Sequence, residues 1–185
     1  GTYFLTWTTT PWTLPGNTAL AIGKGIQYKA VQKNGEILIL SYLLIGSAIG
    51  EVDKNIQDIS AKNLIGLEYE PLFDYYSEDF KSFNLHNGWR VYGTDFVKID
   101  EGTGIVHIAP AFGADDMTLF WKYNLPFIQH VGMDGKFKKE VKDFHGLSVK
   151  PKDAHQSTDN KIIEWLDKNK KLFKSEKSTH SYPHC

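Results

Sequence analysis

The sequence predicts a mostly β fold with peripheral helices, in which the strands close wholly or partly into a barrel. Short runs of β-branched and aromatic residues, separated by turn residues, dominate the 185-residue chain. These runs do not alternate with long helical patterns, as the strands of a parallel sheet would. Because closure removes exposed strand edges, a closed or partly closed barrel fits this pattern best.

The expected strands lie in the first 110 residues of the chain. They cover residues 3–10, 18–22, 27–32, 36–40, 65–72, 89–99 and 105–108. The dipeptide Asn34-Gly35 separates two of these runs and is a strong hairpin signal. Gly93 is expected to form a β-bulge. Residues 41–49 are expected to form a short helix that Gly50 ends, and residues 73–86 a loop.

The C-terminal part is expected to contain two helices and a second hairpin. Acidic Asp115 and Asp116 suit the first turn of a helix that continues to residue 123. Residues 127–131 and 136–141 flank a glycine-rich turn. The clearest helix pattern covers 159–170, with Thr158 or Asp159 as its cap. The lysines within 168–171 are expected to form a solvated helix end, although contact with phosphates stays open.

Composition limits the classes of protein to which the chain can belong. The net charge is −1, so any contact with nucleic acid has to be local. The single cysteine, Cys185, cannot form an internal disulfide and indicates a reducing compartment, so we expect a cytoplasmic location. No apolar run is long enough for a membrane span, and we expect no membrane partner. We expect one domain, residues 1–185, excised from a longer protein.

The stretch from residue 102 to 116 is the centre of the predicted site. Apolar β-branched residues around His107 favour a buried strand, and Pro110 stops it. Gly113 then supplies a turn before Asp115 and Asp116 open the helix. His107 and two carboxylates are thereby brought toward one mouth. The alternative is a buried strand whose aspartates only cap a helix.

A second candidate element is the threonine-rich loop near the N-terminus. Five threonines lie between Thr6 and Thr13, and their hydroxyls can donate and accept hydrogen bonds without charge. The neighbouring Pro11, Trp12 and Pro15 indicate a rigid, shaped loop. The alternative is an edge strand with threonine on its solvated face.

The remaining patterns exclude several chemistries. No G-x-S-x-G elbow, P-loop or GxGxxG motif is present, so nucleophilic and phosphate-loop sites are not indicated. His180, His184 and Cys185 are metal ligands by type but are too few for a site. What remains is a neutral threonine loop, one histidine and a carboxylate pair. Such a site would bind an amino group and position water on a labile bond.

Two segments of the chain resemble the editing domain of isoleucyl-tRNA synthetase, an insertion in a class I catalytic domain. They are residues 7–17, WTTTPWTLPGN, and residues 102–116, GTGIVHIAPAFGADD. Valyl and leucyl relatives typically have arginine and an acidic residue where this chain has Thr10 and Trp12, which favours the isoleucyl member. The C-terminal residues 181–185 resemble the return to the catalytic domain, so the resemblance spans the chain.

The resemblance implies a β-barrel with peripheral helices and post-transfer editing, the hydrolysis of valine from the 3′ end of isoleucine tRNA. Water would be the nucleophile, with no metal or cofactor in this domain, ATP being used by the full-length catalytic domain. The partners would be the tRNA 3′ end, misacylated valine and the rest of the synthetase. The implied catalytic residues are Thr8, Thr9, Thr10, His107 and Asp116, and the implied substrate-binding residues are Trp12, Thr13, Asn17 and Asp116.

The implied roles differ among these residues. Asp116 would hold the α-ammonium group of the amino acid. The threonines would contact the ester and the terminal adenosine, while Trp12 and His107 would bound the pocket for the amino-acid side chain. Three alternatives stay open: a valyl- or leucyl-type editing domain, a tRNA-binding barrel without hydrolytic activity, and a structural barrel whose motifs only pack.

Overall fold

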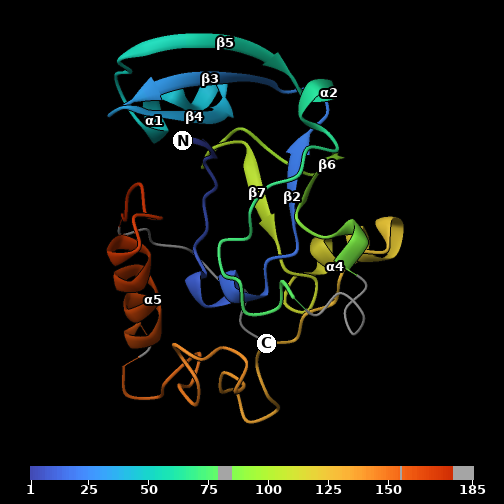
Figure 1. Ribbon diagram of the computed structural model, residues 1–185, viewed down its shortest axis with the longest axis vertical. Coiled ribbons are helices and arrows are strands. Elements are labelled where there is room, and N and C mark those ends of the chain that lie inside the picture. The colour runs from blue at the N-terminus through green and yellow to red at the C-terminus, as the bar shows by residue number, and fades with distance from the viewer. Residues whose placement is uncertain (79–84, 155, 177–185) are drawn as a thin grey trace.

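The computed structural model describes residues 1–78, 85–154 and 156–176 (Figure 1). Within them, the strands form a four-stranded sheet and a three-stranded sheet. The four-stranded sheet lies at one end of the molecule, and two longer helices flank the part that contains the three-stranded sheet. The mostly β fold with peripheral helices is therefore confirmed. The described strands form two separate sheets rather than one closed barrel.

The four-stranded sheet has the strand order β1-β4-β3-β5. Asn34 and Gly35 both have positive φ, of 51° and 82°, and they join β3 to β4 as the sequence predicts. Strand β1 pairs with β4 in parallel, so the chain enters the sheet at its edge. The bounds are β1 Thr2–Phe4, β3 Gln27–Lys33, β4 Glu36–Ser41 and β5 Lys54–Ser60.

The edge strand β5 was not predicted from the sequence. Six of its seven residues are exposed, so it lacks the apolar alternation that marks a half-buried strand. It is held instead by backbone pairing with β3, with a register shift between Ala30 and Val31. A one-turn helix, α2 (Ala61–Leu64), follows it directly.

The three-stranded sheet has β2 (Ala19–Gly23) at its centre, with β6 (Arg90–Thr94) parallel on one side and β7 (Ile105–Ile108) antiparallel on the other. Every residue of β2 is buried. The predicted bulge at Gly93 is wrong, because Gly93 pairs with Ile22 in unbroken register. A Cβ there would lie 2.6 Å from the side chain of Ile65, which explains the glycine.

Two predicted strands are wrong or too long. Residues 65–72 form no strand: they lie beside β6, to which Gly66 and Leu67 hydrogen-bond, but the pairing is limited to one isolated bridge between Glu68 and Arg90. The expected strand over 3–10 ends at Phe4. The chain then crosses to the smaller sheet, where Trp7 bridges Val106. This crossing brings the threonine-rich stretch beside β7.

The helices match the predictions more closely than the strands do. Tyr42–Leu44 is a 3-10 turn, η2, that continues into α1 (Ile45–Ala48), and Gly50 follows with a φ of +68°. The other helical elements are η1 (Pro11–Gly16), η3 (Leu85–Asn87), α4 (Ala114–Tyr123) and α5 (Ser157–Lys168). The expected turn at residues 132–135 forms, with backbone hydrogen bonds from Gly132 to Lys136 and from Lys138 to His130, but the flanking strands are wrong because only the bridge between Val131 and Phe137 pairs.

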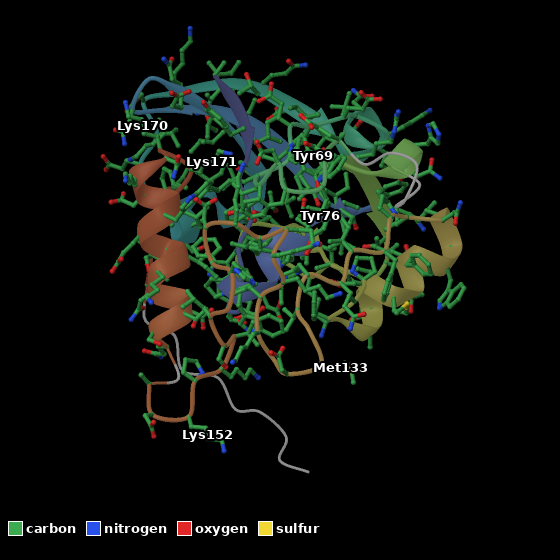
Figure 2. The ribbon with its side chains drawn as sticks, turned by 60° about the horizontal axis from the view of Figure 1, so that its bottom comes forward. Tyr69, Tyr76, Met133, Lys152, Lys170 and Lys171 are labelled. Atoms are coloured by element: carbon green, nitrogen blue, oxygen red, sulfur yellow. The ribbon has the colours of Figure 1, made fainter. Side chains whose placement is uncertain are left out.

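Helix α5 starts earlier than predicted, and neither expected cap acts as one. The residue before its first turn is Gln156. The Thr158 hydroxyl instead donates to Ser148 O, and Asp159 accepts a hydrogen bond from the backbone of η1. Figure 2 shows Lys170 and Lys171 at the far end of this helix, with Tyr76 nearer the middle of the molecule. The helix covers an aromatic core that includes Phe73, Phe137 and Phe144.

Candidate functional site

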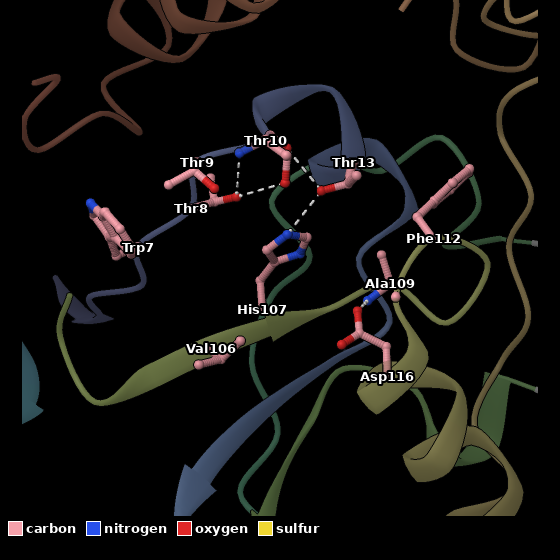
Figure 3. Close-up of a pocket in the computed structure, with 11 residues that line it drawn as sticks. Trp7, Thr8, Thr9, Thr10, Thr13, Val106, His107, Ala109, Phe112 and Asp116 are labelled. Atoms are coloured by element: carbon pink, nitrogen blue, oxygen red, sulfur yellow. Dashed lines mark hydrogen bonds between the residues drawn. The ribbon is translucent and has the colours of Figure 1, made fainter. Parts of the chain in front are cut away.

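A pocket of about 300 Å³ opens between the threonine-rich stretch, β7 and the start of α4 (Figure 3). Its walls come from segments that are about 100 residues apart in the sequence. The lining residues are Trp7, Thr8, Thr9, Thr10, Thr13, Val106, His107, Ala109, Phe112, Gly113 and Asp116. The structure therefore brings together six of the eight predicted site residues: Thr8, Thr9, Thr10, Thr13, His107 and Asp116.

The turn η1 presents Thr13 to the pocket. Pro11 fits the first position of a helical turn, where its missing N–H leaves no bond unmade. The Thr13 N–H donates to Thr10 O at 3.0 Å and the Thr13 hydroxyl donates to the same oxygen at 2.9 Å. Because that hydroxyl's only proton is used, its oxygen is left as an acceptor toward β7.

His107 donates the hydrogen bond that the Thr13 hydroxyl oxygen accepts. Its Nε2 lies 3.0 Å from Thr13 Oγ1, so we assign the proton to Nε2 and a bare lone pair to Nδ1. Burial, together with the nearby His130 ring, lowers the pKa of His107 to about 4. At neutral pH the imidazole is therefore uncharged and has a fixed orientation. The imidazole is therefore a weak base and a rigid part of the pocket wall.

The three preceding threonines have unequal freedom. The Thr8 hydroxyl accepts a bond from the Thr10 N–H at 3.1 Å and lies 3.4 Å from the Thr10 hydroxyl (Figure 3). This local turn fixes both side chains. Thr9 is exposed and lines the pocket, and within the described part of the chain its hydroxyl has no hydrogen-bond partner. Thr9 is thus the hydroxyl most available to a ligand.

Asp116 supplies the negative charge of the pocket from the first turn of α4. Its Oδ2 accepts a bond from the Ala109 N–H at 2.8 Å, which ties the helix start to the end of β7. A Cβ at Gly113 would lie 2.8 Å from the Asp116 carboxyl carbon, so the glycine leaves room for this carboxylate. Burial raises the pKa of Asp116, which makes it a carboxylate that gains from a cationic partner.

Two predicted residues do not line the pocket. The side chain of Asn17 is buried and fully used: its Nδ2 donates to Ala19 O at 2.9 Å, and its Oδ1 accepts from the Tyr69 hydroxyl at 2.6 Å. Asn17 therefore joins the turn to the small sheet. Trp12 lies behind the wall, with its ring 5.2 Å from that of Phe112. It shapes the pocket through Phe112.

Sequence analysis missed two groups that support the site. Asp159 Oδ1 accepts from the Trp12 N–H at 3.1 Å, which attaches α5 to η1. His130 is fully buried, and its Nε2 lies 2.9 Å from Trp12 O. Neither belongs to a recognisable motif, and the contacts span 147 and 118 residues. The other lining residues that were not predicted, Trp7, Val106, Ala109, Phe112 and Gly113, all lie inside the two motifs and were within reach of a sequence signal.

Other chemistries find no support in the described residues. Among residues 1–78, 85–154 and 156–176, no group of histidine, cysteine, aspartate and glutamate side chains is arranged to hold a metal ion. The terminal His180, His184 and Cys185 lie outside the described residues. In the part of the chain that the structure describes, no helix is both long and apolar enough to span a membrane.

Comparison with proteins of known sequence finds isoleucine--tRNA ligases among the relatives of this chain. The chain is 48% identical over 183 residues to the isoleucine--tRNA ligase of Clostridium acetobutylicum and 44% identical to that of Clostridium tetani. The match to the ligase of Bdellovibrio bacteriovorus is 39% identical and covers the whole chain. The chain spans only 16% of the length of the two clostridial ligases. No protein-family model matches it.

Solved structures share the fold at low sequence identity. The crystal structure of GlLeuRS-CP1 matches 97% of this chain and 85% of its own, with a TM-score of 0.68 at 19% identity. A Plasmodium falciparum cytosolic leucyl-tRNA synthetase editing domain matches 86% of this chain and 67% of its own, with a TM-score of 0.50 at 14% identity. The chain belongs to the isoleucyl-tRNA synthetase family, as the segment that has the fold of a synthetase editing domain.

Proposed function

We propose that this domain hydrolyses the ester that links a wrong amino acid, chiefly valine, to the 3′ adenosine of isoleucine tRNA. One observation carries the proposal: a half-buried carboxylate, a neutral oriented imidazole and a free hydroxyl face one pocket of about 300 Å³. Relatives of the chain are isoleucine--tRNA ligases, which supports isoleucine as the cognate amino acid of the proposal. The tRNA 3′ end and the rest of the synthetase are its partners.

The ammonium group of the substrate binds Asp116. The carboxylate is anchored by the Ala109 N–H and keeps further lone pairs for a ligand. Because burial raises its pKa, a cation beside it relieves part of the cost of its charge. A charge-assisted hydrogen bond of this kind also orients the amino acid in the pocket.

His107 acts as the wall that rejects isoleucine. One methylene in an apolar pocket is worth only about 1–3 kcal/mol, and isoleucine against valine is itself the standard example of this limit. A second, smaller pocket solves the problem by excluding the larger side chain. An imidazole held by Thr13 cannot easily yield, because forcing an extra methylene into a packed site costs a further 1–3 kcal/mol or so.

Water is the nucleophile, and the pocket orients it. The water oxygen bonds to the ester carbonyl carbon, the bond from that carbon to the ribose oxygen breaks, and the ribose oxygen takes a proton. The products are free valine and free tRNA. With its pKa at about 4, His107 is a poor general base. Catalysis therefore comes from orientation and hydrogen bonding, and the Thr9 hydroxyl is the group most available to donate a hydrogen bond.

Deacylation assays test this function directly. The chain, alone and within a full-length isoleucine--tRNA ligase, is incubated with valyl- and isoleucyl-charged isoleucine tRNA, and released amino acid is followed over time. We expect rapid loss of valine and slow loss of isoleucine. If neither form of the protein releases amino acid above the buffer blank, the hydrolytic function is contradicted, and a tRNA-binding module without hydrolytic activity remains. A stable valyl adduct on Thr9 in mass spectra of quenched reactions would contradict the water mechanism.

A further inference from the structure

His130 is a buried polar group beside the site, and the proposed mechanism leaves it without a role. Its side chain is 0% exposed, and it lies directly behind the wall of the pocket. Its Nε2 lies 2.9 Å from Trp12 O, a carbonyl oxygen that can only accept, so the histidine donates. The hydrogen bond from His130 therefore attaches the backbone of η1 to the protein interior.

The same ring also packs against the opposite wall of the pocket. Phe112 lines the pocket, and its ring meets that of His130 edge to face, with centroids 4.7 Å apart. On its other side His130 stacks on Phe137, 5.6 Å away, which belongs to the main aromatic core. One imidazole thus joins η1, Phe112 and the core.

The second nitrogen shows that the histidine is not there for packing alone. Its Nδ1 is buried and has no partner among the described residues, which carries a desolvation cost that an apolar ring would avoid. An added Cβ at Gly16 would lie 2.4 Å from this nitrogen. The last residue of η1 is therefore seated directly on the ring, and the fit leaves no room for a methyl group.

We propose that His130 is a positioning residue that sets the width of the pocket by fixing η1 and Phe112 to the core. The path to the reacting groups is short, because Trp12 precedes Thr13, and Thr13 holds the imidazole of His107. If the Trp12 carbonyl is released, Thr13 and the His107 wall lose their support. This inference rests on the proposed function and adds a determinant of its selectivity.

Three variants separate positioning from mere packing. His130→Ala removes both the donor and the ring, whereas His130→Gln keeps an N–H donor for Trp12 O. Gly16→Ala keeps the histidine but pushes its ring. Phe144→Leu is the matched control, because Phe144 contacts Phe137 in the same core and has no hydrogen bond to η1 within the described residues. Rates on valyl- and isoleucyl-tRNA are measured for each within the full-length ligase.

The expected signature is a change in selectivity. His130→Ala and Gly16→Ala should each lower the ratio of valyl to isoleucyl deacylation rates by about tenfold, the lower end of what one methylene provides. His130→Gln should restore most of that ratio, and the Phe144→Leu control should lower the melting temperature with the ratio unchanged. An unchanged ratio in His130→Ala, or an equal loss in Phe144→Leu, would overturn the positioning role while leaving the proposed function intact.

A second readout does not depend on hydrolysis. In amide NMR spectra of the chain, His130→Ala should shift or broaden the resonances of Trp12, Thr13 and Phe112, and Phe144→Leu should leave them in place. If the wild type hydrolyses neither ester, the proposed function fails, and the spectra still decide whether His130 holds the two walls. Unmoved resonances in His130→Ala would contradict the positioning role by themselves.

Discussion

The four-stranded sheet and the pocket are built by different kinds of contact. In the sheet, β3 and β4 are joined by a two-residue turn, and their pairing follows from local sequence. In the pocket, local bonds shape each segment, but the bonds that join the segments involve side chains and are long-range. Thr13 and His107 are 94 residues apart, and Trp12 and Asp159 are 147 apart. Local patterns build the scaffold, and distant polar contacts build the site.

The two regions also differ in energetic cost. Two of the buried side-chain nitrogens that have no partner among the described residues, Nδ1 of His107 and of His130, lie in or behind the pocket wall. Burial lowers the pKa of His107 and of His130 and raises that of Asp116, so in each case it favours the uncharged form. The buried, uncharged imidazoles of the pocket wall therefore carry a desolvation cost. The four-stranded sheet also has a buried hydroxyl without a partner among the described residues, that of Ser41 in β4, but none of its groups is a buried imidazole.

Acid gives the largest expected effect, and it acts on the pocket. Burial lowers the pKa of both His107 and His130 to about 4, from an ordinary 6.5. Their contribution to folding is complete above pH 6.5 and is lost as the pH falls toward 4, at most roughly 3 kcal/mol per ring. Asp116, with its raised pKa, offsets part of this.

Urea unfolding of the wild type and His130→Gln between pH 7 and pH 4 measures the acid effect. The variant should lose clearly less stability over this range, because one buried imidazole is gone. Equal pH dependence in the two proteins would mean that His130 is not a buried neutral ring.

Removing the carboxylate of the pocket gives the next effect. Asp116→Ala should weaken binding of a non-hydrolysable valyl-adenosine analogue by about 10- to 150-fold, since a lost charge-assisted contact costs roughly 1.5–3 kcal/mol. The fold should survive with a loss of roughly 1–3 kcal/mol, because the buried Ala109 N–H loses its acceptor. Calorimetric titration measures both proteins. The neighbouring Asp115→Ala is the control, because Asp115 is exposed and does not line the pocket.

Removing the His107 side chain should change the selectivity between isoleucine and valine more than the rate of valine release. His107→Ala should begin to release isoleucine from correctly charged tRNA, a gain of about tenfold or more, while valine release continues. Time courses on both charged tRNAs, beside a melting curve, test it. If His107 were the general base, both rates would fall together in the variant, and the wild-type rate would fall with pH as His107 becomes protonated. Intact selectivity with a lower melting temperature would leave only a structural histidine.

The contact between the two sheets should matter for stability alone. The buried Tyr28 hydroxyl accepts from the Gly23 N–H at 2.9 Å and donates to Gly104 O at 2.8 Å, so it joins β3 to one end of the smaller sheet, where β2 ends and β7 begins. Tyr28→Phe should cost roughly 1–2 kcal/mol by leaving these groups unpaired. Deacylation per folded molecule should not change. The control is Tyr42→Phe, whose ring is 53% exposed.

The smallest effect is expected in the hairpin of the large sheet. Gly35 has a φ of +82°, which strains any side chain, so Gly35→Ala should cost roughly 1 kcal/mol without affecting hydrolysis. Gly25→Ala is the matched control, since its added Cβ would meet nothing within 4 Å and its φ is not in the positive range. A loss of activity in Gly35→Ala would break the separation between scaffold and site.

Sequence reasoning succeeded where structure follows from neighbours. The Asn34-Gly35 hairpin, β2, β7 and the two longer helices follow from local turn chemistry and apolar period. The pattern of strand, loop and helix start predicted that His107 and Asp116 lie together, the family resemblance joined the threonines to them, and the structure places these residues around one pocket. Strand β5 was missed because an exposed edge strand carries no apolar alternation.

The failures share a physical cause. Asn17 was assigned to the pocket, but its amide is used by Ala19 and Tyr69, and no pattern in the sequence gives that bond. His130 was not noticed because a lone histidine in an apolar run has no signal of its own. Thr158 and Asp159 were expected to cap α5, but distant backbone groups take their side chains. Long-range polar contacts outweigh local preferences in each case.

A crystal structure of the chain with a non-hydrolysable valyl-adenosine analogue tests the central claim most directly. The account predicts the α-ammonium group within hydrogen-bond distance of Asp116, the valine side chain against His107, and the ester position beside Thr9. An analogue that binds elsewhere, for example in the open groove that Tyr42 and Leu43 line, would contradict it. So would an analogue in the pocket whose ammonium points away from Asp116.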